Sequence, residues 1–131
     1  MANAYINLYM NNPTAGGTDG TAISTDGTYT SPLTVSLDAA INESKTVKLA
    51  VRTEAGYTTS GDTVISDTGD TNDRWKLCMT ESGTFTDSIT ISNAITNANT
   101  VFYAKASSVD TELPSTDRSV SLRVMSVITA V

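Results

Sequence analysis

Hydrophobic and polar residues alternate with a period of two along most of this chain. The first expected strand, residues 5–10, carries Ile6, Leu8 and Met10 on one face and Tyr5, Asn7 and Tyr9 on the other. Apolar residues are nowhere sustained at helical spacing, and Thr and Ser, which are poor in helix interiors, occur throughout. The pattern therefore predicts strands and no substantial helix.

Seven further segments show the same alternation, at residues 33–37, 46–53, 63–66, 74–79, 88–92, 101–106 and 119–129. In residues 74–79 the alternation predicts that Trp75, Leu77 and Met79 point inward. In the last segment the apolar residues change from one face of the strand to the other at Val127, which predicts a bulge or bend.

Turn residues separate these segments. Asp19-Gly20-Thr21 and Asp26-Gly27-Thr28 predict hairpin turns, because glycine supplies the positive φ that such turns need, and residues 42–45 predict another turn. Short strands joined by turns rather than helices predict an all-β fold, an antiparallel β-sandwich of seven to eight strands. No linker divides the chain, so we expect a single domain over residues 1–131.

Composition narrows the possible settings and partners. With 8 basic and 14 acidic residues the formal charge is −6, which disfavours nucleic acid and anionic membranes as partners. No segment approaches the roughly 20 apolar residues of a membrane helix, and no signal peptide is recognisable, so a soluble protein is expected. The lone Cys78 forbids an intrachain disulfide.

The sequence offers few residues for catalysis. It has no histidine, which excludes Ser-His-Asp triads, Cys-His pairs and metal sites with imidazole ligands. Cys78 is expected to be a structural thiol, because activation needs a positive, accessible environment and only Lys76 lies near it. We therefore expect no enzyme activity, no catalytic residues and no cofactor.

One acidic segment could bind a metal. Asp62, Asp67, Asp70 and Asp73 could together supply oxygen ligands to calcium. Their spacing lacks the pattern of an EF-hand loop, and Asp is common in turns because it bonds to its own backbone. Turn chemistry is therefore favoured over a metal site.

Aromatic residues suggest two kinds of contact. A sugar-stacking platform could be formed by Trp75, Tyr5, Tyr9, Tyr29, Tyr57 and Tyr103, although alternation favours a core position for Trp75. The first strand carries apolar or aromatic groups on both faces, which an exposed edge strand usually avoids. An intersubunit or capsid contact is therefore predicted at Tyr5, Tyr9 and Met10, with burial inside the chain's own sheet as the alternative.

Three stretches cover most of the chain: MANAYINLYMNNPTAGGTDGT, KTVKLAVRTEAGYTTSGDTVIS and NTVFYAKASSVDTELPSTDRSVSLRVMSVITAV. They resemble small immunoglobulin-like proteins encoded among the virion genes of tailed bacteriophages and prophages of Gram-positive bacteria. The resemblance implies an immunoglobulin-like β-sandwich with a non-enzymatic role, as a capsid decoration (cement) subunit or as a tail or neck subunit.

The resemblance also implies partners and a location. The partners would be phage capsid or tail proteins and further copies of the chain. The location would be the virion, reached from the bacterial cytoplasm without a signal peptide or disulfides. A module that binds carbohydrate or a host surface is the alternative from another functional class.

Overall fold

The computed structural model describes residues 5–23, 37, 43–68, 74–108 and 121–131. The regular structure of these residues is entirely β, without a helix, which confirms the predicted all-β class. The strands are β1 (Ile6–Met10), β2 (Thr21–Ala22), β3 (Ser44–Thr53), β4 (Tyr57–Thr68), β5 (Trp75–Cys78), β6 (Ser88–Ile91), β7 (Thr100–Ser107) and β8 (Ser121–Ala130).

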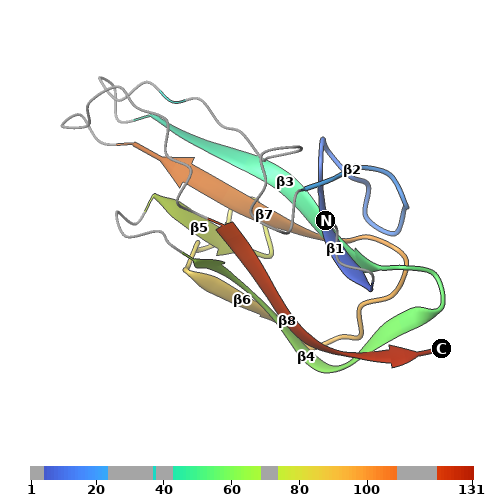
Figure 1. Cartoon of the computed structure of the whole chain (residues 1–131). Coiled ribbons are helices and arrows are strands. Elements are labelled where there is room, and N and C mark those ends of the chain that lie inside the picture. Colours follow the sequence, from blue (N-terminus) through green and yellow to red (C-terminus); the bar gives the residue numbers. More distant parts are fainter. Residues whose placement is uncertain (1–4, 24–36, 38–42, 69–73, 109–120) are drawn as a thin grey trace.

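These strands form two antiparallel sheets (Figure 1). One has five strands in the order β2-β1-β3-β7-β5, and the other has three in the order β6-β4-β8. Every pairing between the named strands is antiparallel. Because both sheets turn apolar side chains toward one shared core, the arrangement is a β-sandwich.

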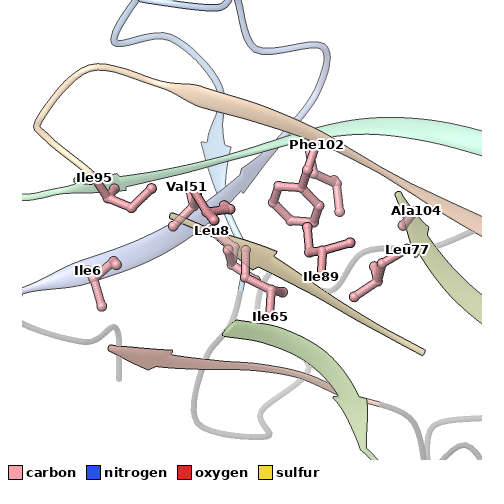
Figure 2. Close-up of a cluster of buried hydrophobic side chains, with 11 residues drawn as sticks. Ile6, Leu8, Val51, Ile65, Leu77, Ile89, Ile95, Phe102 and Ala104 are labelled. Atoms are coloured by element: carbon pink, nitrogen blue, oxygen red, sulfur yellow. The ribbon is translucent and has the colours of Figure 1, made fainter. Parts of the chain in front are cut away.

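The core follows directly from the alternation along the central strands. Leu49 of β3 pairs with Phe102 of β7, and both side chains are fully buried. Ile65 of β4 and Ile89 of β6 pair with each other in the facing sheet and join the same cluster (Figure 2). Burying such side chains contributes roughly 1.5–3 kcal/mol each, so this cluster is the main source of stability.

Strand positions agree with the predicted pattern for most segments, with differences at the ends. β3 begins at Ser44, so the turn predicted at residues 42–45 is wrong for Ser44 and Lys45. β4 is much longer than the predicted residues 63–66, because the ten-residue β8 gives it a partner over most of its length. Leu37 is not in a strand; the rest of the predicted strand 33–37 and the Asp26-Gly27-Thr28 turn lie outside the described residues.

The bulge expected in the last strand lies in its partner instead. The β4–β8 register shifts between Ser60 and Val64, where Gly61 has a φ of 77°. β8 keeps its parity: Ser126 points inward and its Oγ lies 2.9 Å from Thr63 Oγ1, while Val127 is 63% exposed. The irregularity predicted at Val127 therefore lies opposite it in β4, and β8 keeps its alternation because a hydroxyl pair occupies the inward position.

The prediction that Trp75, Leu77 and Met79 point inward is confirmed only in part. Leu77 is fully buried, and Trp75 packs against the core but is only half-buried. Met79 is 37% exposed, because β5 ends at Cys78 and the chain then turns, with the Gly83 N–H donating to Thr80 O (3.5 Å). The prediction of an inward Met79 is wrong.

Candidate interaction surfaces

The outer face of β1 is covered by the chain itself. β1 lies between β3, which pairs with Ile6–Tyr9, and β2, which pairs with Tyr9 and Met10. Asn7 donates to Glu54 Oε1 (3.2 Å) and the Tyr9 hydroxyl donates to the same oxygen (3.5 Å). The guanidinium of Arg52 lies over the Tyr9 ring, 3.5 Å from its centroid. Burial raises the pKa of Tyr9, against the opposing influence of the Arg52 charge.

This covering bears on the contact predicted at Tyr5, Tyr9 and Met10. Tyr9 is 6% exposed and Met10 is half-buried against the core, whereas Tyr5 is 46% exposed. The Tyr5 ring meets Tyr57 edge to face, with centroids 4.9 Å apart. The reason for expecting a partner there, an uncovered strand, is thus removed within the chain, and the intersubunit contact stays a prediction.

A polar network fixes the loop between β1 and β2 to the same end of the large sheet. Asp19 accepts hydrogen bonds from the Thr14 N–H and hydroxyl (both 2.8 Å) and from the Asn99 amide (3.0 Å). Arg52 donates to Asp19 O and to Asn99 Oδ1, both at 2.8 Å. Asn99 is only 5% exposed, so its amide makes the hydrogen bonds to the loop backbone that water would otherwise make. We call this network of Thr14, Asp19, Arg52 and Asn99 the clamp, because it holds the loop in place.

Asp19 makes the stability of the clamp depend on pH. Its hydrogen bonds from the Thr14 N–H and hydroxyl lower its pKa, so the folded state favours the carboxylate. Its contribution is full above the ordinary Asp pKa and is lost as the pH falls through the lower folded-state pKa. We expect Asp19→Asn to lose less stability than wild type between about pH 7 and pH 3 in chemical unfolding. Equal losses in the two proteins would contradict this role.

The acidic residues of the candidate metal segment are only partly described. Asp62 is exposed beside the bulge of β4, and Asp67 is half-buried near the far end of the same strand. Asp67 lies five residue steps along the strand from Asp62, which is about 15 Å and too far for the two to share an ion. Both therefore lie in a strand rather than in the predicted turn, and Asp70 and Asp73 lie outside the described residues.

The aromatic residues do not form one platform. Trp75 faces the core, Tyr9 is stacked under Arg52, and Tyr5 meets Tyr57 where the two sheets adjoin. Tyr103 is half-buried on β7, and Tyr29 lies outside the described residues. Stacking on a sugar ring needs free, neighbouring aromatic faces, which these described positions do not provide together.

Cys78 is enclosed by the turn that follows β5. It is 9% exposed, and its Sγ accepts from the Thr80 N–H at 3.5 Å. This hydrogen bond lowers the pKa of Cys78. A Cβ on Gly83 would lie 2.7 Å from this sulfur, so the turn packs tightly over the thiol. Lys76, the cation nearest in sequence, forms an ion pair with Asp87 at 2.7 Å. The surroundings are those of a packed thiol.

Most of the described basic groups sit on the five-stranded sheet and contact the chain itself. Lys105 lies over the Phe85 ring at 4.6 Å, Lys76 pairs with Asp87, and Arg52 belongs to the clamp. Lys48 pairs across the strands with Tyr103 on the same face. Such contacts bury the aliphatic stems of these side chains and leave the charges at the surface.

Exposed apolar side chains gather instead on the outer face of the three-stranded sheet. Met125 is 50% exposed and Val127 is 63% exposed, and both project from β8. Met125 pairs in register with Val64, which is half-buried on β4. We call Val64, Met125 and Val127 the β8 patch. Met125 and Val127 are two of the five large hydrophobic side chains that are exposed among the described residues.

No protein-family model, curated protein or solved structure matches this chain. No helix that is long and apolar enough to cross a bilayer occurs in the part of the chain that the structure describes. Within the same residues no three His, Cys, Asp or Glu side chains converge as metal ligands.

Proposed function

We propose that this chain is a non-enzymatic structural subunit of a tailed-phage virion. It would be an immunoglobulin-like β-sandwich that binds the capsid surface as a decoration, or cement, subunit. The phage setting rests on the sequence resemblance. The mode of action, contact rather than chemistry, rests on how the described side chains are used.

The observation that carries the proposal is the contrast between the polar clamp and the β8 patch. The groups best suited to chemistry, Asp19, Arg52 and Asn99, bond to one another and to loop backbone. Side chains that are held by such a hydrogen-bond network keep the loop in one conformation. Met125 and Val127, by contrast, offer apolar surface to solvent, as a protein that works by association requires.

A stable sandwich without disulfides also suits a particle subunit. The pairing of β3 with β7 runs over eight residue pairs and buries Leu49 and Phe102 at its centre. Strand pairing over this length and a close-packed core favour a rigid module. Function on such a module depends on its surfaces rather than on the fold.

Particle composition tests the proposal directly. A tagged copy of the chain is expressed in a host that produces the phage encoding it, and virions are purified on a density gradient and imaged. We expect the chain to purify with particles and to occupy repeated sites on the capsid. Heads and tails separated before analysis distinguish a decoration subunit from a tail or neck subunit.

Two outcomes would contradict the decoration role. Absence of the chain from purified particles would reject a virion role. Binding of the purified chain to a glycan array, together with that absence, would favour the carbohydrate-binding alternative.

A further inference from the structure

β8 is an unusually long end strand. It has ten residues, Ser121–Ala130, and among the described strands it pairs with β4 alone. The other end strands are short: β2 has two residues, and β5 and β6 have four each. Proteins usually protect an end strand by short length, Pro, Lys or a bulge. β8 contains no Pro, Gly or Lys.

The register of β8 defines which backbone groups face away from β4. The Val131 N–H donates to Gly56 O at 2.9 Å, so Val131 points its backbone groups toward β4. Alternate residues of an antiparallel strand point these groups to opposite edges. The N–H and C=O groups of Val124, Ser126 and Ile128 therefore point to the outer edge of the sheet.

The charges on β8 suit a second copy of the same chain. The protein carries a formal charge of −6, so most pairs of its surfaces repel one another. β8 holds no acidic residue and a single basic one, Arg123. Two β8 strands can thus approach each other with less repulsion than acidic surfaces would meet.

We propose that β8 pairs antiparallel with β8 of a second copy about a two-fold axis at Ser126. In this register Val124 and Ile128 pair across the axis on the inner face, so that the backbone groups facing outward meet each other. On the outer face Met125 lies opposite Val127 of the other copy, and Arg123 lies opposite Thr129 of the other copy. The register sets no like charges opposite each other and joins two apolar pairs.

This contact joins the two three-stranded sheets into one continuous six-stranded sheet and brings the two β8 patches side by side. Such strand addition derives affinity from backbone hydrogen bonds and specificity from side-chain pairs. A two-fold contact is also closed, so it stops at a dimer. The dimer is independent of the proposed virion role, because the purified chain forms it without particles.

A charge exchange tests both the contact and its register. Full-length wild type, Met125→Glu, Val127→Lys and the double variant are compared by sedimentation velocity over a concentration series. Wild type is expected to dimerise. Each single variant is expected to raise the dissociation constant at least about tenfold, because every substitution occurs twice in a two-fold dimer. The double variant is expected to recover most of the affinity, since each Glu then faces a Lys.

Thr90→Lys is the matched control. Thr90 is exposed on β6, the opposite end strand, where it pairs with Val64. A lysine at this position adds a charge to the same sheet away from β8. The variant is expected to dimerise like wild type, and thermal melts check that all variants fold. A monomeric wild type, or a dimer that the single variants leave unchanged, would overturn the contact. A double variant no stronger than the single variants would overturn the register centred on Ser126.

Discussion

Replacing Phe102 with alanine is expected to lower the free energy of unfolding by about 3–5 kcal/mol. The Phe102 side chain is fully buried in the core cluster (Figure 2), and the residue pairs across the strands with Leu49 of β3. Truncation removes a large apolar surface and leaves a cavity that the surrounding strands can fill only in part. Urea unfolding measures the loss, and a melting temperature lower by roughly 10–20 °C is expected with it.

Trp75→Ala is the comparison for this variant. Alternation along the sequence places Trp75 in the core, but the structure leaves it half-buried against the cluster. Its truncation should therefore cost less than that of Phe102, because part of its surface stays in water in the folded state. A larger loss for Trp75→Ala than for Phe102→Ala would contradict this packing order.

Asn99→Ala is expected to lower the free energy of unfolding by about 2–4 kcal/mol. The Asn99 amide donates to Thr14 O (3.1 Å) and Asp19 O (3.2 Å), and its carbonyl accepts from Arg52 (2.8 Å). Alanine would remove one hydrogen-bond partner from each of these groups at a site that is 5% exposed, although Gly17 still donates to Thr14 O and Arg52 still donates to Asp19 O. Chemical unfolding, monitored by circular dichroism, measures the effect.

Asn97→Ala provides the matched control, because Asn97 is exposed two residues earlier in the same loop. Its effect should lie within about 0.5 kcal/mol of zero, as is usual for surface substitutions. Equal effects at the two positions would mean that the clamp adds nothing beyond the loss of an asparagine. The clamp would then be a geometric coincidence and not a source of stability.

Much of the fold could be predicted because a strand shows its two faces in its own sequence. The alternation of residues 101–106 sets Phe102, Ala104 and Ala106 on one face of β7, and all three are buried there. Ile89 and Ile91 follow the same rule on β6. The period of two is a property of the local backbone, so it can be seen without knowing any partner strand.

The surroundings of the candidate contact residues could be predicted less well. Arg52 and Glu54 cover Tyr9 from strand and loop positions more than 40 residues away in sequence, and the subunit contact at Tyr9 stays a prediction. The bulge or bend predicted at Val127 is absent from β8, because Ser126 holds the inward position through its contact with Thr63 and the register shift lies in β4. In both cases a partner distant in the sequence decides which face of the strand meets solvent.

The sequence by itself determined the all-β class, the position of most strands and the inward face of regular strands such as β6 and β7, because these depend on neighbouring residues. The tertiary structure alone decided which strands pair, where the bulge falls and which loop residues enter the interior. Ile95 lies in the loop between β6 and β7 and is fully buried, its N–H bonded to Thr59 Oγ1 at 2.8 Å. Asn99 holds Thr14 across 85 residues of chain. Such contacts leave no periodic pattern in the sequence. They form only when the folded sandwich brings together polar groups that are distant in the chain and removes them from water.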